Sequence, residues 1–165
     1  MVPLILLTAA FVPMLLEARV SARHDRALRS TGAVEPADDV LRWMQVAYPA
    51  CFLAMVVEAW ARGSRVNLEF AAGVVLFVLA KGLKYWAIAT LGDRWTFRVL
   101  VPPQSTRVTA GPYRFLRHPN YVAVAGELAG MAIMAQAPIA GIVAIAGFGL
   151  LMILRIRVEE RELGL

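Results

Sequence analysis

Residues 111–121 combine the polar, basic and aromatic side chains with which this sequence could do chemistry. They read Gly111-Pro112-Tyr113-Arg114-Phe115-Leu116-Arg117-His118-Pro119-Asn120-Tyr121. Proline suits the first position of a helix, so we expect His118-Pro119 to open one. The free backbone N–H groups at that start, with Arg117 beside them, would bind an anion such as an amino-acid carboxylate. The rings of Tyr113 and Tyr121 would attract a cation, and a sulfonium is one.

Arg155 and Glu159 form a second candidate pair near the C-terminal end of the sequence. They are four residues apart, so they share one face of a helix. Charged residues at the end of a membrane helix are interfacial anchors by default. In a dry site, however, an arginine would orient an acidic oxygen strongly.

Glu127 falls near the middle of an apolar segment, where an ionisable group is costly and usually functional. It could act as a base for a hydroxyl acceptor, or it could pair with Lys81 or Lys84. The structural pairing is the favoured interpretation. We expect Glu17 to reach the membrane interface, and no cluster of side chains predicts a metal site.

These candidates must be positioned by membrane-spanning helices. Hydrophobic residues make up 59% of the chain, well above the share in a soluble domain, so lipid must cover the excess. Five segments have the length and composition of a span. They are residues 2–18, 43–61, 68–91, 119–136 and 138–154. Pro138 makes the last two a tight helical hairpin. Within it, Gly126 and Gly130 are expected to face Gly141, Gly147 and Gly149.

Two long polar connections, residues 21–42 and 92–117, separate the spans. With five spans, both connections and the C-terminus share one side, and that side carries nearly all of the arginines. The arginine bias places them in the cytoplasm and the N-terminus outside. The net charge of +5 then points to anionic lipid rather than to nucleic acid. We expect one all-α integral membrane domain over residues 1–165, with three N-terminal spans in 1–92 and the loop, hairpin and catalytic element in 93–165.

The two candidate elements resemble the isoprenylcysteine carboxyl methyltransferase family. Residues 111–121 match its Gly-x-Tyr-x-x-x-Arg-His-Pro-x-Tyr pattern at every position, and residues 155–160 match its Arg-x-x-x-Glu-Glu close. Within the superfamily the chain is most similar to the short bacterial branch associated with alkylpyrone and alkylresorcinol O-methylation. The residues that carry this resemblance are the run 86–92, Gly111-Pro112-Tyr113 and His118-Pro119-Asn120-Tyr121.

The resemblance implies S-adenosylmethionine as cofactor, with S-adenosylhomocysteine as its product, and a long cytoplasmic loop that holds it. Glu159 would contact the cofactor from the last helix, and Arg155 would face the methyl acceptor. The other implied cofactor contacts are Ser105, Thr106, Arg107, Val108, Tyr113, His118, Pro119, Asn120 and Tyr121. The expected reaction is methyl transfer to an oxygen of a lipid-like acceptor, either a carboxylate or a phenol or enol.

Three alternatives remain. A phospholipid amine N-methyltransferase keeps the cofactor, but Arg155 suits an anionic oxygen better than an amine. A membrane sterol-type reductase would bind NADPH, although the sequence has no Gly-x-Gly-x-x-Gly fingerprint. A non-enzymatic scaffold would leave the tyrosine- and arginine-rich loop unexplained.

Overall fold

The structure is a bundle of five α-helices. It is a computed structural model that describes residues 1–33, 35–36, 39–100 and 108–162. The α-helices are α1 (Val2–Ser30), α2 (Leu41–Arg62), α3 (Leu68–Leu91), α4 (Pro119–Ala135) and α5 (Pro138–Glu162). Two short 3-10 helices, η1 (Gly92–Arg94) and η2 (Gly111–Arg114), lie between α3 and α4. The described residues contain no strand, which confirms the all-α prediction.

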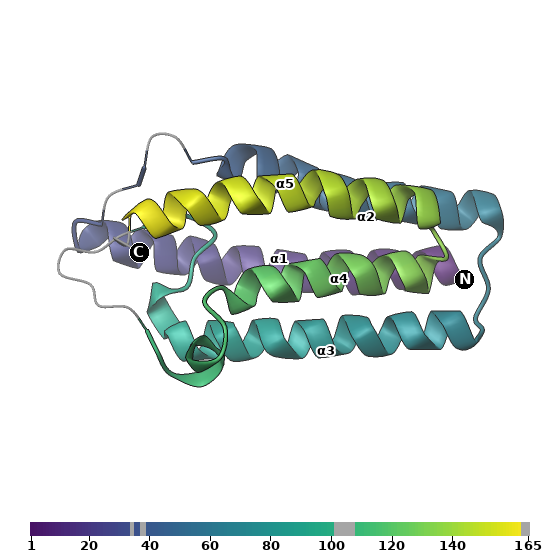
Figure 1. Cartoon of the computed structure of the whole chain (residues 1–165), viewed down its shortest axis with the longest axis horizontal. Coiled ribbons are helices and arrows are strands. Elements are labelled where there is room, and N and C mark those ends of the chain that lie inside the picture. The colour runs from purple at the N-terminus through teal and green to yellow at the C-terminus, as the bar shows by residue number, and fades with distance from the viewer. Residues whose placement is uncertain (34, 37–38, 101–107, 163–165) are drawn as a thin grey trace.

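The helices run alternately up and down the bundle. Figure 1 shows the N-terminus at one end, and the α1–α2 connection, the α3–α4 connection and the end of α5 together at the other. The two candidate elements, residues 111–121 and 155–160, therefore meet at one end of the bundle. The predicted hairpin is confirmed: α4 ends at Ala135, Gln136 after it has a left-handed backbone, and α5 begins at Pro138.

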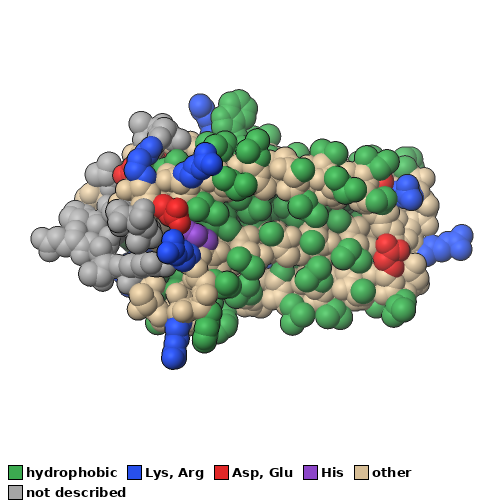
Figure 2. All heavy atoms as spheres, viewed as in Figure 1, with side chains coloured by type: hydrophobic (Ala, Val, Ile, Leu, Met, Phe, Trp, Pro, Cys, Tyr) green, Lys and Arg blue, Asp and Glu red, His purple; other side chains and the backbone are tan. Residues whose placement is uncertain are grey.

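The surface suits a membrane. α1, α2, α3 and α5 are long and apolar enough to cross one. Large apolar side chains are exposed along the helices, and Figure 2 shows them over the middle of the visible face, with charged side chains gathered toward its ends. The fifth predicted span is present as α4, but its 17 residues are the shortest length that suits a span, so its crossing stays a prediction.

Helix α1 is longer than the sequence indicated. The sequence predicted a polar connection over residues 21–42. Residues 21–30 belong to α1 instead, so this part of the prediction is wrong. The charged end of α1 binds the chain that follows α3. Ser21 Oγ accepts a hydrogen bond from the Phe97 N–H at 2.8 Å. His24 donates from Nδ1 to the Trp95 carbonyl at 2.7 Å.

The closest helix pair is α3 with α4, and glycine makes it possible. A Cβ atom on Gly73 would lie 2.2 Å from the Met134 nitrogen, and one on Gly130 would lie 2.6 Å from the Phe77 nitrogen. Gly130 thus faces α3, which corrects the expectation that it packs within the α4–α5 hairpin. Small residues allow such backbone contact between membrane helices.

That correction extends to the other glycines of the hairpin. Gly126 also faces α3, where its Cβ would meet Ala80 at 2.9 Å. Gly141 does face α4, but Gly147 and Gly149 have open space beside them. The pattern of small residues thus predicts close packing correctly for Gly126, Gly130 and Gly141, but the helix that Gly126 and Gly130 contact is α3.

Candidate active site

The loop that carries residues 111–121 is seated on the end of α3. Gly111 has a φ of +54°, in the left-handed region that favours glycine. A Cβ there would also lie 2.3 Å from Thr90 Oγ1, so a side chain has no room. Pro112, which follows, is buried and is the second residue of η2. The Gly-Pro pair therefore fixes where Tyr113 and the start of α4 lie.

The start of α4 faces the carboxylates of α5. Tyr121 donates from its hydroxyl to Glu159 Oε1 at 2.5 Å. His118 Nδ1 lies 3.5 Å from Glu159 Oε2, and His118 Nε2 lies 3.1 Å from Glu160 Oε1. The positive end of a helix macrodipole favours this arrangement. The structure thus brings together both elements of the predicted site, although they are about 40 residues apart in sequence.

These contacts determine which charges the site carries. Contact with Glu159, and then with Glu160, raises the pKa of His118 above its ordinary 6.5, although burial opposes the rise. Burial, followed by the charge of Glu159, raises the pKa of Tyr113, which keeps that phenol neutral. We expected a bound anion at the start of α4, and the carboxylates of Glu159 and Glu160 supply part of that negative charge. In addition, the backbone N–H groups of Tyr121 and Val122 already donate to the His118 carbonyl.

Arg155 is almost entirely buried, with 3% of its surface exposed. Its Nη1 donates to Asp39 Oδ1 at 2.6 Å, and its Nη2 donates to the Phe97 carbonyl. Its Nε lies 3.7 Å from Glu159 Oε1. The guanidinium therefore connects the carboxylate of α5 to the α1–α2 connection. Sequence reasoning missed Asp39 and Phe97, because neither spacing nor residue type links them to Arg155.

The residues around Glu159 fit S-adenosylmethionine. Two carboxylates and two tyrosine rings form an electron-rich surface, which suits the sulfonium and the ammonium of that molecule. Asn120 Oδ1 is buried and has no hydrogen-bond partner among the described residues, so a ligand N–H could satisfy it. Pro119 is buried beside it, and Val108 is half-buried. Three further predicted contacts, Ser105, Thr106 and Arg107, lie outside the described residues.

Glu127 lies deeper in the bundle, within a buried charge cluster of Glu17, Lys81, Lys84 and Glu127. Lys81 Nζ is 2.8 Å from Glu17 Oε1 and 2.9 Å from Glu127 Oε2. Lys84 Nζ is 2.7 Å from Glu17 Oε2 and 3.3 Å from Glu127 Oε1. Tyr48 donates its hydroxyl to Glu127. The predicted pairing of Glu127 with lysine is present, and Glu17 takes part instead of reaching the interface. A role for Glu127 as base stays a prediction.

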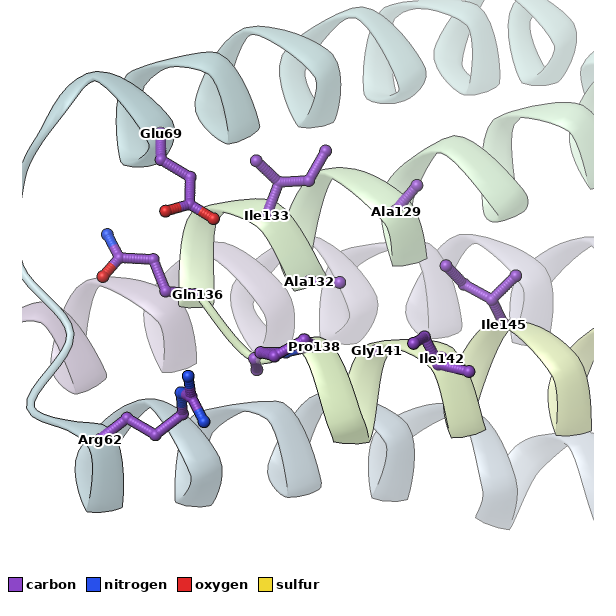
Figure 3. A pocket seen from close by; sticks show the side chains of 11 residues that line it. Arg62, Glu69, Ala129, Ala132, Ile133, Gln136, Pro138, Gly141, Ile142 and Ile145 are labelled. Atoms are coloured by element: carbon purple, nitrogen blue, oxygen red, sulfur yellow. The ribbon is translucent and has the colours of Figure 1, made fainter.

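A hollow of about 510 Å³ lies at the opposite end of the bundle. Figure 3 shows it beside the α4–α5 turn, with Glu69, Ile133, Pro138 and Ile142 among the side chains that line it. None of the predicted site residues lines it, so it does not bear on the candidate site. Among the described residues, no group of histidine, cysteine and acidic side chains gathers that could hold a metal ion.

Comparisons with known proteins agree with this geometry. Residues 73–164 match the model of the isoprenylcysteine carboxyl methyltransferase family. An uncharacterised protein of Haemophilus influenzae is 25% identical over 142 residues, which cover 86% of this chain and 83% of that protein. The uncharacterised protein YpbQ of Bacillus subtilis is 23% identical over 159 residues, which cover 96% of this chain and 95% of that protein. No solved structure matches.

Four apolar helices of span length are those of an integral membrane protein, and the carboxylate- and tyrosine-rich candidate site lies at one end of their bundle. The matched residues make up more than half of the chain, so it belongs to the isoprenylcysteine carboxyl methyltransferase family. Members of this family are membrane methyltransferases that use S-adenosylmethionine.

Proposed function

We propose that this chain transfers a methyl group from S-adenosylmethionine to an oxygen of a lipid-like acceptor. The observation that carries the proposal is the connected set Tyr121, Glu159 and Arg155. It joins the start of α4, where the loop ends, to the last helix, where the acceptor would be oriented. When bound, the cofactor supplies an electrophilic methyl group and leaves as a neutral thioether.

On the cofactor side, the protein's task is to hold a cation. We propose that Glu159 faces the sulfonium or the ammonium, while Tyr121 and His118 keep that carboxylate in place. Tyr113, Pro119, Asn120 and Val108 would form the surrounding wall. This arrangement places the reacting atoms without covalent help from the chain, and alignment of that kind lowers the barrier to a displacement reaction.

On the acceptor side, we propose that Arg155 orients the attacking oxygen. The low exposure of the guanidinium supports this role, because a charge removed from water acts strongly on a nearby oxygen. A lipid-like tail suits the apolar helix faces beside the site. A phospholipid amine suits Arg155 less well, because the N–H donors of a guanidinium can hold one lone pair of an oxygen while another attacks, whereas an amine nitrogen has a single lone pair. The family match gives no support to an NADPH-dependent reductase or to a non-enzymatic scaffold.

Titration of the purified protein with S-adenosylhomocysteine in detergent tests the cofactor side. We expect the wild type to bind, Glu159→Gln to bind at least tenfold more weakly, and Glu162→Gln to match the wild type. Glu162 is an exposed acid on the same helix, so it controls for loss of charge. Absence of binding by the folded wild type would refute the proposal. Incubation of membranes with methyl-labelled cofactor and lipid extracts would then identify the product.

A further inference from the structure

The hollow beside the α4–α5 turn lies on the lipid-facing surface, at the end of the bundle opposite the candidate site. Its volume of about 510 Å³ falls within the range of about 300–1,000 Å³ that is typical of small-molecule sites. Ile133, Ile142 and Ile145 line it and are exposed, so it opens on the outside of the apolar helices. Lipid tails cover such helix faces in a bilayer, and lipid molecules therefore reach the hollow.

The hollow has a polar end and an apolar end. Figure 3 shows Arg62, Glu69 and Gln136 near the α4–α5 turn, and Ala129 and Ile145 farther along the helices. The polar side chains thus come from the ends of helices, and the apolar ones come from within α4 and α5. A bilayer lipid has the same order, with its head at the membrane surface and its tails toward the middle. The lining therefore fits an amphiphile that lies along the helices.

The two charged side chains at the polar end have opposite signs and are not neutralised by close partners. Arg62 Nη1 lies 3.9 Å from Glu58 Oε1, beyond hydrogen-bond distance. The Glu58 carboxylate instead accepts hydrogen bonds from the Ala140 N–H at 2.6 Å and the Ile139 N–H at 3.3 Å. Glu69 has no ion-pair partner in the described part of the chain. One cation and one anion are therefore available to a ligand beside the hollow.

The segment between these two charges is fixed against the α4–α5 turn. Gln136 donates from Nε2 to the Arg65 carbonyl at 2.8 Å and to Asn67 Oδ1 at 2.9 Å. Ser64 donates its hydroxyl to the Ala135 carbonyl at 2.6 Å. The two charges flank this segment, at the end of α2 and the start of α3, so both are positioned before a ligand arrives. Binding to groups that are already in place loses less conformational freedom.

We propose that the hollow binds a phospholipid with a phosphoethanolamine head. Its phosphate accepts hydrogen bonds from Arg62, because the planar guanidinium matches phosphate oxygens. Its ammonium donates N–H groups to Glu69. One acyl chain lies over Ala129 and Ile145.

The same lining disfavours two other common heads. A phosphoglycerol head has the phosphate but offers no cation to Glu69. A phosphocholine head carries a cation without N–H donors, and no aromatic ring of the described residues lines the hollow to bind it. The bound lipid is also distinct from the methyl acceptor, because none of the residues that we assign to methyl transfer lines the hollow.

Native mass spectrometry of the delipidated protein in detergent tests this proposal. The competing probes are phosphatidylethanolamine, phosphatidylglycerol and phosphatidylcholine with the same acyl chains, at equal concentrations. We expect the wild type to bind phosphatidylethanolamine about fivefold better than either competitor, the upper value for one exposed ion pair. Glu69→Lys places two cations at the polar end, so its preference should change to phosphatidylglycerol. Glu162→Lys, the same charge change at an exposed site at the other end of the bundle, should keep the wild-type preference.

A second pair of variants tests the apolar end. Ala129→Phe should fill the space for the acyl chain and remove the preferred lipid. Val143→Phe, which is exposed on α5 but does not line the hollow, should bind as the wild type does. The ratio of bound lipids is measured on one folded species in one spectrum, so partial misfolding of a variant does not disturb it.

Three results would overturn the proposal. Equal binding of the three lipids by the wild type would indicate a nonspecific lipid shell. A wild-type preference for phosphatidylglycerol or phosphatidylcholine, or an unchanged preference in Glu69→Lys, would contradict the head group. A dimer that survives delipidation and is lost in Ala129→Phe would show that a second copy of the chain fills the hollow. None of these outcomes depends on methyl transfer, so the proposed function is tested separately.

Discussion

Replacing Glu127 by glutamine should unbalance the buried charge cluster and destabilise the bundle. The cluster contains two glutamates and two lysines, so it is neutral, and the variant leaves one positive charge in excess. At an effective dielectric constant of about 20, unit charges 2.9 Å apart attract by about 6 kcal/mol before desolvation is counted. Desolvation offsets much of that attraction. Breaking a buried pair by removing one partner still costs about 3–5 kcal/mol.

The free energy of unfolding, measured by denaturant titration in micelles, tests this value. Glu69→Gln is the control, since Glu69 is exposed on α3 and its loss should cost no more than about 0.5 kcal/mol. Adding Lys84→Met to Glu127→Gln restores neutrality and should recover at least half of the loss. The reasoning fails if Glu127→Gln is as stable as the control, or if the double variant is less stable than Glu127→Gln alone. Full turnover by folded Glu127→Gln would also exclude Glu127 as the base.

Three further predictions concern the site and the helix packing. His118→Gln should lower the free energy of unfolding, and the loss should be complete at a pH below 6.5, the ordinary pKa of histidine. The raised pKa of His118 means that the folded state binds the proton more tightly than the unfolded state does. The deficit should shrink as the pH rises through the raised value, and a deficit that grows with pH in thermal unfolding would contradict this. Tyr121→Phe should weaken S-adenosylhomocysteine binding about tenfold in calorimetric titration, since it removes a hydrogen bond to a charged group. Unchanged affinity would refute the positioning role. Gly73→Ala should cost about 1–3 kcal/mol through overlap with Met134, whereas Gly147→Ala, which has open space, should cost little in the same unfolding assay.

Hydropathy predicted most of the helical framework. The segment 43–61 corresponds to α2, and 68–91 agrees with α3 at both ends. The last apolar run, 138–154, is the first part of α5, which extends to Glu162. Apolar segments of span length have few alternatives to helix in lipid, because every backbone N–H and C=O must be paired within the segment. That constraint makes helices in this chain predictable from composition alone.

Hydropathy did not predict the part of α1 that continues as a helix beyond the apolar run of residues 2–18. α1 has 29 residues, about 44 Å at 1.5 Å per residue, which exceeds a hydrocarbon core of about 30 Å. Hydropathy therefore predicts a loop for its charged last third. It also predicts that Glu17 reaches the interface, although Glu17 is 4% exposed and pairs with both lysines of α3.

The sequence predicted the two candidate elements but not every contact between them and the rest of the chain. Residues 111–121 and residues 155–160 are each a local pattern, and the resemblance to a family indicated that the two patterns belong to one site. The partner of Arg155 was not predictable, because Asp39 is 116 positions away and precedes a helix, where an acid is ordinarily a cap. Long-range pairs of this kind depend on how the helices pack, which the sequence alone does not reveal.

The close contact of α3 with α4 has a consequence for how the protein enters the membrane. α4 is short and carries Glu127, and an acidic residue at the centre of a span opposes insertion by about 2.5–3.5 kcal/mol. Lys81 and Lys84, which neutralise it, belong to the helix that the ribosome makes just before. If α4 crosses the membrane as predicted, α3 would have to remain at the insertion machinery until α4 emerges, so that the two helices enter lipid as one unit.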